Sequence, residues 1–178
     1  CYRCPFEKEY PDCNLFCIDY LDRIIEAESA GSLAGLIIEP YQGTAGFVFP
    51  PEGYLKKLEE WAIQRNLIFI LDEVQSSFGR TGKMWALEHE KLKPDILCLG
   101  KGIGSGVPIA AVVTRAEIIS SLETGEMSST AGGNPLSCAA ALAVLEIMEK
   151  ERLVEKAAKN GEDLKEKLNR LKEKYKMI

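Results

Sequence analysis

The sequence predicts an α/β fold in which helices flank a mostly parallel sheet in three layers, followed by the start of a smaller C-terminal domain. Two observations carry this prediction. Short, continuous apolar runs such as 67–71 and 96–99 are typical of strands buried on both faces. These runs alternate with longer segments of helical periodicity, and such alternation is typical of βαβ units around a parallel sheet.

The N-terminal segment predicts a loop, a helix and a first strand. Residues 1–17 lack periodicity and contain two prolines, so we expect a loop. Residues 19–30 place apolar side chains at i, i+3 and i+4, which predicts an amphipathic helix that Gly31 ends. The apolar run 33–38 then predicts a buried strand, and Glu39 follows it directly.

The next unit is a loop, a helix and a second strand. Residues 41–49 are punctuated by glycine and predict a loop. Residues 51–66 predict a helix with Pro51 in its first turn, where the missing N–H is not needed. The apolar run 67–71 predicts the second strand, which Asp72 ends.

Two further strands are expected before the chain becomes helical. The run 96–99 predicts a third strand, which leads directly into Gly100 and Lys101. The run 109–113 predicts a fourth, and residues 115–122 have a helical pattern.

The C-terminal part predicts two helices of different character. Residues 135–149 are alanine-rich and apolar on most sides, so we expect a long, well-buried helix. From residue 150 the pattern is amphipathic, with Leu164, Leu168 and Leu171 at helical spacing. Because the composition changes from apolar to charged there, we place a domain boundary between 1–146 and 147–178.

Composition excludes few classes of protein. The chain is 46% hydrophobic and 28% charged, with a formal net charge of -5, so no basic field favours nucleic acid or an anionic membrane. No apolar run is long enough to span a bilayer, and no signal peptide is evident, so we expect a cytoplasmic protein. The chain opens on Cys1 and reaches residues 175–178 within a helical pattern, so we also expect a fragment of a longer polypeptide.

The six cysteines suggest a separate hypothesis. Cys98 and Cys138 lie inside apolar runs and are typical of small buried hydrophobic residues. The other four are spaced as C-x2-C and C-x3-C near the N-terminus, and four thiolates are able to bind a tetrahedral zinc. The alternative is a reduced, cysteine-rich surface loop. The four residues of this cluster are Cys1, Cys4, Cys13 and Cys17.

The chemically informative residues follow the predicted strands. Glu39, Asp72 and Lys101 each come at or just after a strand end, and in open α/β sheets such ends meet along one edge. A lysine that forms a Schiff base and a carboxylate that pairs with a pyridine nitrogen are what pyridoxal 5'-phosphate (PLP) requires. Such a lysine must become neutral to react, so we expect Lys101 to be desolvated or to lie near other positive charge. Taken singly, Asp72 is more often a turn cap than a cofactor ligand, and Lys101 more often a solvated loop lysine than a Schiff-base lysine.

Nucleotide-binding motifs do not fit the same glycines. A Walker loop ending at Gly100-Lys101 requires glycine at position 95, which is Asp95. A dinucleotide fingerprint beginning at Gly102 requires glycine at position 107, which is Val107. The glycines near Lys101 are therefore interpreted as allowing close approach of the backbone.

Four motifs in order resemble those of the class III aminotransferases, which include ornithine, acetylornithine and 4-aminobutyrate enzymes. Residues 71–82 read L-D-E-V-Q-S-S-F-G-R-T-G and are similar to the family's D-E-V-Q-x-G-F-G-R-T-G signature. Residues 94–103, 39–43 and 129–135 resemble its lysine segment, its E-P-x-Q-G motif and its T-x-x-G-N-P motif. The resemblance covers nearly the whole chain and implies the PLP-dependent transferase fold, fold type I.

The resemblance also implies a role for each matching residue. Lys101 is implied as the Schiff-base lysine and proton shuttle, and Asp72 as the partner of the pyridine nitrogen. Val74 is implied to pack on the ring, and Gln75 to donate to its phenolic oxygen. Thr130 is implied to bind the cofactor phosphate in the neighbouring subunit, which predicts a homodimer with a shared active site. Glu39 is expected to brace the site without taking part in the chemistry.

One departure from the family pattern leaves the substrate open. Thr44 stands where many members have a glutamate that pairs with an arginine for the substrate carboxylate. The resemblance thus implies transfer of an amino group between an amino acid or ω-amine and a 2-oxo acid, without naming either. A PLP-dependent racemase of the same fold is the alternative with the same residues, and a cysteine-rich zinc-binding module is the alternative of another class.

Overall fold

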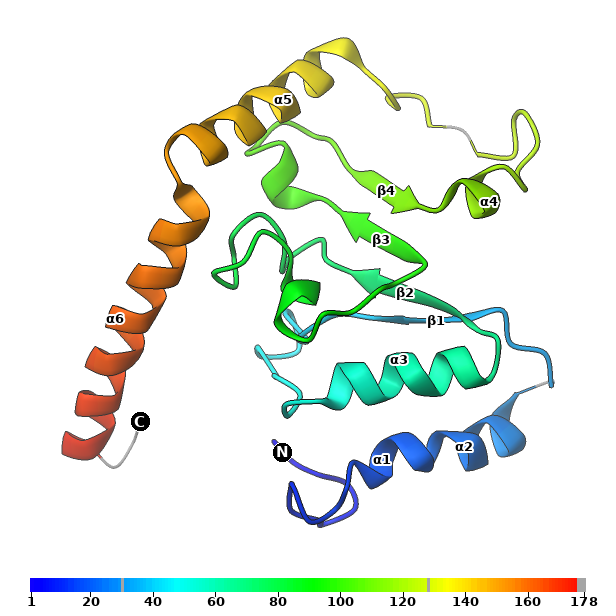
Figure 1. Ribbon diagram of the computed structural model, residues 1–178, viewed down its shortest axis with the longest axis vertical. Coiled ribbons are helices and arrows are strands. Elements are labelled where there is room, and N and C mark those ends of the chain that lie inside the picture. The colour runs from blue at the N-terminus through cyan, green and yellow to red at the C-terminus, as the bar shows by residue number, and fades with distance from the viewer. Residues whose placement is uncertain (30, 128, 176–178) are drawn as a thin grey trace.

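The computed structural model describes residues 1–29, 31–127 and 129–175. Its centre is a four-stranded sheet with the order β1-β2-β3-β4, shown in Figure 1. The first three strands run parallel, and the fourth is antiparallel to the third. The mostly parallel α/β sheet predicted from the sequence is therefore confirmed. The strands are β1 (Gly35–Ile38), β2 (Ile68–Asp72), β3 (Ile96–Leu99) and β4 (Ala111–Thr114).

The reversal at β4 follows from the short connection that precedes it. Between β3 and β4 the chain has only residues 100–110, which include the short 3-10 helix η2 (Lys101–Ile103). A parallel return needs a crossover of a dozen or more residues, usually with a helix. The chain therefore turns back on the same side and pairs antiparallel.

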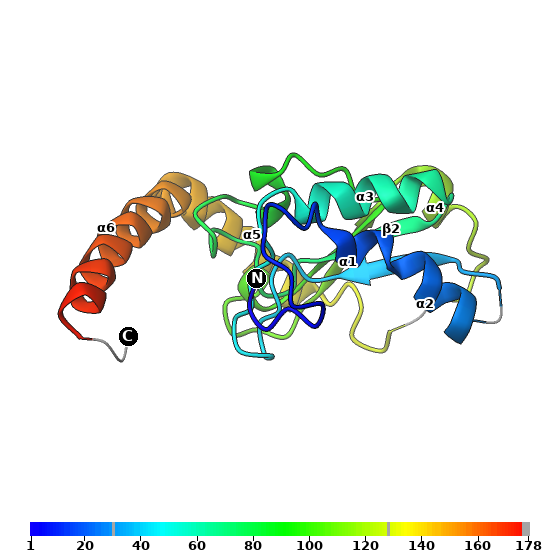
Figure 2. The same cartoon turned by 90° about the horizontal axis from the view of Figure 1, so that it is seen from below.

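Helices lie around this sheet but leave much of one face open, as Figures 1 and 2 show. Ile37 of β1 and Val112 of β4 are 60% and 55% exposed, so the burial on both faces predicted for the strands is wrong for these residues. α3 packs against β2, and α1 in turn packs against α3. The long helices α5 and α6 follow the sheet and meet at a corner (Figure 1). The helices are α1 (Phe16–Asp19), α2 (Leu21–Glu28), α3 (Tyr54–Gln64), α4 (Ala116–Ile119), α5 (Pro135–Lys150) and α6 (Leu153–Lys174), with a second 3-10 helix, η1 (Ala86–His89).

The hydrophobic core lies between α3 and one face of the sheet. Leu58 and Ala62 of α3 are buried against Phe69 and Leu71 of β2. Leu55, Leu58, Trp61 and Ala62 are the apolar side of the helix that its periodicity predicts, and all four are buried. Side chains on neighbouring positions of β1 alternate, so Ile37 points away from this core and is 60% exposed.

The start of α3 differs from the prediction. Pro51 does not lie in the first helical turn, because α3 begins at Tyr54. Gly53 precedes it with φ of +77°, a conformation that favours glycine and breaks the helical path. Pro51 instead accepts a hydrogen bond from the Tyr54 N–H in a turn. The helix was therefore predicted correctly, but its first residue was not.

The burial predicted for residues 135–149 is wrong in the described part of the chain. α5 forms as expected, capped by the Asn134 side chain, which accepts from the N–H groups of Leu136 and Ser137. Its Leu136 and Leu142 side chains are 77% and 61% exposed. The helix packs mainly against η2 and α6, so most of its apolar surface has no neighbour.

Other boundaries shift by a few residues. The helix predicted for 19–30 is divided into α1 and α2, which end at Glu28; Ala30 lies outside the described residues. The helical pattern of 115–122 gives only α4, after which the Ser121 hydroxyl donates to the Ile118 carbonyl and competes with the helix. The predicted helical ending at 175–178 lies outside the described residues beyond Tyr175.

The amphipathic helix predicted beyond residue 150 is present as α6. A left-handed residue, Arg152 with φ of +53°, separates it from α5. The boundary between domains 1–146 and 147–178 stays a prediction, and the break at Arg152 lies a few residues beyond it. Within the described ranges, no helix has both the length and the apolar character needed to cross a bilayer.

Candidate active site

The three parallel strands bring the expected residues to one edge of the sheet. Leu71 of β2 pairs with Ile38 of β1, and Asp72 pairs with Cys98 of β3. Glu39 follows β1 directly, and Lys101 comes two residues after β3. This edge faces α6 in Figure 1. The convergence predicted from the strand ends is therefore what the topology produces.

Glycines allow the loops at this edge to touch. A Cβ added to Gly43 would lie 1.8 Å from Gln75 Oε1, so the loop after β1 contacts the loop after β2. A Cβ on Gly100 would lie 3.1 Å from Val74 Cγ1, so the loop after β2 also contacts the end of β3. At both positions a Cβ would come too close to a neighbouring side chain, so glycine is needed. For Gly100 this confirms the interpretation that the glycine allows close approach of the backbone.

Asp72 is half-buried and has two interactions that matter here. Its Oδ1 accepts a hydrogen bond of 3.0 Å from the Val74 N–H, so it does cap the following turn. This single bond leaves the second carboxylate oxygen available within the described part of the chain. Burial, together with the nearby charge of Asp72, raises the pKa of the Cys98 thiol.

Glu73, which follows Asp72 directly, is the most enclosed acid at this edge. Its side chain is fully buried. The carboxylate accepts hydrogen bonds from the N–H groups of Ala86 and Leu87 and from the Ser76 hydroxyl. A glutamate directly after a buried strand was the available signal, but its partners, 13 and 14 residues further on, follow no periodic pattern.

Gln75 presents an unpaired polar atom. Its Oε1 is buried and has no hydrogen-bond partner among the described residues. Such an atom costs free energy unless something not in the chain satisfies it. Val74 is half-buried beside it, against Gly100.

The exposure of Lys101 contradicts its expected desolvation. The residue begins η2 with φ of +42°, and its side chain is exposed. It lines an open depression of about 540 Å³ together with Arg80 and residues 105–109, and Asp72 and Gln75 do not line this depression. The described residues that flank Lys101 are mainly glycines and a serine, which are too small to cover it.

The other two expected residues lie further out. Glu39 Oε2 accepts a hydrogen bond of 3.2 Å from the Gly43 N–H, which fits its expected bracing role in the 39–43 motif. Thr44 is exposed in the same loop. Thr130 is exposed in a turn before α5 and does not line the depression at Lys101, so its proposed phosphate contact stays a prediction.

A family assignment follows from comparison with known proteins. The sequence profile of the family described as Aminotransferase class-III matches residues 2–178. The chain belongs to the class III aminotransferases.

Individual relatives cover this class III chain almost completely. Leucine/methionine racemase from Thermococcus litoralis is 44% identical over 179 residues, covering 100% of the chain and 40% of the racemase. Ornithine aminotransferase from Oceanobacillus iheyensis is 46% identical, covering 81% of the chain and 36% of that protein. The crystallised ornithine aminotransferase of Toxoplasma gondii superposes with a TM-score of 0.80 and 37% identity. The match covers 86% of this chain and 35% of that one, and that structure has partial occupancy of PLP at its active site. The chain thus spans about 40% or less of the length of these relatives.

The described residues of this class III chain do not group the N-terminal cysteines as the zinc hypothesis requires. Among the described residues, no group of three or more histidine, cysteine, aspartate or glutamate side chains is arranged to hold a metal ion. Cys4 and Cys17 line a separate pocket of about 420 Å³. Hydrogen bonds from backbone N–H groups, that of Lys8 first, lower the pKa of the Cys4 thiol, whereas burial raises that of Cys17. The structure therefore gives no support to the zinc-binding module.

Proposed function

We propose that this chain carries part of the active site of a PLP-dependent aminotransferase, which moves an amino group between an amino acid or ω-amine and a 2-oxo acid. The observation that carries the proposal is that Asp72 and Lys101 lie at or just after the carboxyl ends of two neighbouring parallel strands, at one edge of the sheet. Membership of the class III family supports the same chemistry.

The residues at this edge fit PLP. The Gln75 amide is half-buried, and its oxygen has no partner in the described chain; its nitrogen is a donor, which is the group that the phenolic oxygen of PLP needs. The free carboxylate oxygen of Asp72 suits a protonated ring nitrogen, and the Lys101 amine suits an aldehyde. When bound, the cofactor would supply an electron sink beside the reacting carbon of the substrate. The PLP at the active site of the Toxoplasma gondii relative supports the same assignment.

Each side chain would contribute a separate task. Asp72 would hold a positive charge on the ring nitrogen, and Val74 would pack against one face of the ring. Gln75 would donate from its amide nitrogen to the phenolic oxygen. Lys101 would hold the cofactor and then move a proton between the amino-bearing carbon of the substrate and the aldehyde carbon of the cofactor, which a neutral amine does well.

A racemase is the second candidate, because the Thermococcus litoralis racemase matches the whole chain at 44% identity. Racemisation needs the same lysine and aspartate, so these residues do not distinguish the two reactions. Thr44 leaves the substrate open for either reaction, since a threonine cannot form an ion pair with a substrate-binding arginine. Thr44 is exposed in the loop that contacts Gln75, so a different residue must bind the carboxylate of the substrate.

A homodimer and a cytoplasmic setting complete the proposal. Thr130 is exposed and distant in sequence from Lys101, which suits a phosphate contact made to a neighbouring subunit. All six cysteines are unpaired, which suits a reducing compartment. Gel filtration of the native polypeptide tests the homodimer, and cell fractionation tests the cytoplasmic setting.

The reaction itself is tested by offering the native polypeptide, saturated with PLP, a panel of enantiopure amino acids with and without a 2-oxo acid. We expect amino-group transfer, seen as a new amino acid by mass spectrometry, that requires the 2-oxo acid. Loss of optical purity without a 2-oxo acid, seen by chiral chromatography, would instead support the racemase. Neither product with any donor would overturn both.

A further inference from the structure

Glu73 has the hydrogen-bond pattern of a structural clamp placed beside the proposed cofactor site. It follows Asp72 directly, and its side chain is fully buried. Oε2 accepts from the Ala86 N–H at 2.7 Å and from the Ser76 hydroxyl at 3.1 Å. Oε1 accepts from the Leu87 N–H at 2.8 Å. Three donors therefore converge on one buried side chain, which ties the segment at residues 86–87 to the turn at residues 73–77.

The backbone of Glu73 fixes a second set of neighbours. Its N–H donates to the Cys98 carbonyl at 2.9 Å, which extends the pairing of β2 with β3 by one residue. Its carbonyl accepts from both the hydroxyl and the N–H of Ser77, at 2.6 and 3.2 Å. The turn from 73 to 77 is therefore closed on itself, and Gln75 lies in its middle.

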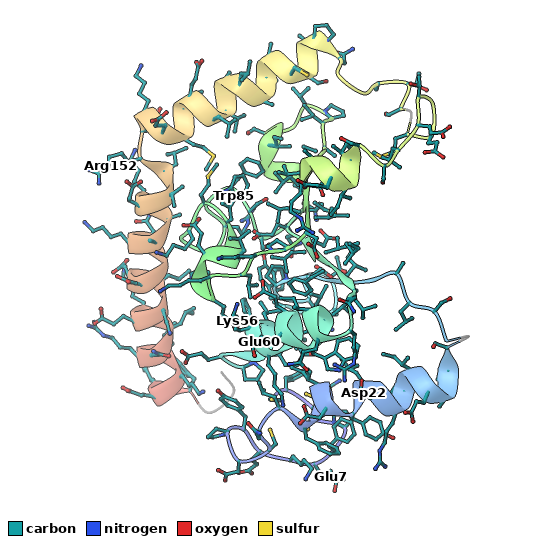
Figure 3. The ribbon with its side chains drawn as sticks, turned by 45° about the vertical axis from the view of Figure 1, so that its right-hand side comes forward. Glu7, Asp22, Lys56, Glu60, Trp85 and Arg152 are labelled. Carbon is teal, nitrogen blue, oxygen red and sulfur yellow. The ribbon has the colours of Figure 1, made fainter. Side chains whose placement is uncertain are left out.

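The carboxylate also reaches the turn that carries Lys101, through a chain of contacts. The residues it holds, Ala86 and Leu87, directly follow Trp85. The Trp85 ring packs edge-on against Phe78, with centroids 5.1 Å apart and an interplanar angle of 73°. A Cβ on Gly102 would lie 3.0 Å from Phe78 Cβ, so Phe78 rests against the residue after Lys101. Figure 3 shows Trp85 between the sheet and the corner of α5 and α6.

We propose that Glu73 is the positioning residue of this site: its carboxylate holds the turn bearing Asp72 and Gln75 in a fixed relation to the turn bearing Lys101. The inference rests on the proposed PLP-dependent function and deepens it. Among the described residues, the hydrogen bonds of the Glu73 side chain do not include Lys101; Glu73 acts through Ala86, Trp85 and Phe78. Catalytic groups need such support, because small displacements of reacting groups reduce rates strongly.

An amide cannot replace this carboxylate. Each oxygen of Glu73 faces at least one backbone N–H, that of Ala86 or that of Leu87. In Glu73→Gln the side-chain NH2 group must therefore face one of these donors, whichever way the amide is turned. The segment that begins at Trp85 should then move away from residue 73. Phe78, which packs against Trp85, should move with it.

The test compares Glu73→Gln with Glu59→Gln in the native polypeptide loaded with PLP. Glu59 is the matched control, because it is also buried and hydrogen-bonded, to Lys56 and to the Lys93 N–H, but lies on α3 in the hydrophobic layer. Three quantities are measured: the melting temperature, the PLP dissociation constant, and the pH midpoint at which the absorbance band of the bound cofactor changes.

We expect both variants to lower the melting temperature. Only Glu73→Gln should change the affinity for PLP and the pH midpoint of its absorbance band. Its PLP dissociation constant should rise about tenfold, as for one buried donor left unpaired. Its pH midpoint should shift by about half a unit or more. A merely structural role would move the melting temperature alone, so a cofactor band and midpoint unchanged from wild type would overturn the inference.

A milder variant keeps the test decisive if Glu73→Gln does not fold. Ser76→Ala removes one of the three hydrogen bonds to the carboxylate and should shift the same two quantities in the same direction, by less. No shift in Ser76→Ala would then overturn the inference. If the wild type itself gives no cofactor band, the proposed function fails; a wild-type band with unmoved variants refutes the positioning role alone.

Discussion

Gly43→Ala is expected to damage the proposed cofactor site while leaving the fold intact. The new Cβ would lie 1.8 Å from Gln75 Oε1, 2.6 Å from its Cδ and 2.9 Å from its Nε2. Ordinary contact begins at 3.4 Å, so the amide must withdraw by about 1.6 Å. Because these atoms are the end of a flexible side chain, Gln75 moves and the backbone does not.

A displacement of this size should remove the proposed hydrogen bond from Gln75 to the cofactor and change the free energy of unfolding little. A hydrogen bond of about 3 Å does not survive a movement of about 1.6 Å. Losing the bond from Gln75 to the cofactor should cost about 1.4 kcal/mol, or a tenfold increase in the PLP dissociation constant. The free energy of unfolding without PLP should change by about 1 kcal/mol or less.

Fluorescence titration with PLP and chemical denaturation of the apo-protein measure the two effects separately. Ala45→Ser is the control, because Ala45 is exposed in the same loop. PLP affinity in Gly43→Ala equal to that of Ala45→Ser would refute the argument that Gln75 faces the cofactor. A large loss of stability would show that the clash is borne by the backbone.

Three further outcomes follow from the structure. Leu58→Ala should cost about 2–5 kcal/mol of unfolding free energy, measured in urea, because Leu58 is buried between α3 and the sheet; a cost below 1 kcal/mol would contradict the described packing. Iodoacetamide at neutral pH should modify Cys4, whose pKa is lowered, before Cys17, whose pKa is raised, as peptide mass spectrometry will show. Asp72→Asn should lower the raised pKa of Cys98 and so speed its alkylation above neutral pH; an unchanged or slower rate would contradict the nearness of that charge.

The strands could be predicted from the sequence because each is a short apolar run between strong breakers. β3 has the residues predicted, 96–99, since Asp95 precedes it and Gly100 follows. Helix ends were less well predicted, because Gly53 and not Pro51 decides where α3 begins. The exposure of α5 was not predictable, since its apolar residues indicate that something should cover it but not which element does.

The site was predictable to the extent that it is local in sequence. Asp72 and Lys101 follow strands, so their shared edge follows from strand order. The exposure of Lys101 was missed, because desolvation depends on neighbours that a motif does not describe. The clamp at Glu73 was missed for a similar reason: its partners Ala86 and Leu87 lie in an irregular segment, and only folding brings them to the carboxylate.

The central claim is that Lys101 holds the cofactor, and covalent trapping tests it most directly. The native polypeptide is mixed with PLP, reduced with borohydride, digested and mapped by mass spectrometry, with Lys101→Ala in parallel. The account predicts one labelled peptide, modified at Lys101, whose label is absent from the variant. A label on another lysine, or an equal label in Lys101→Ala, would contradict it.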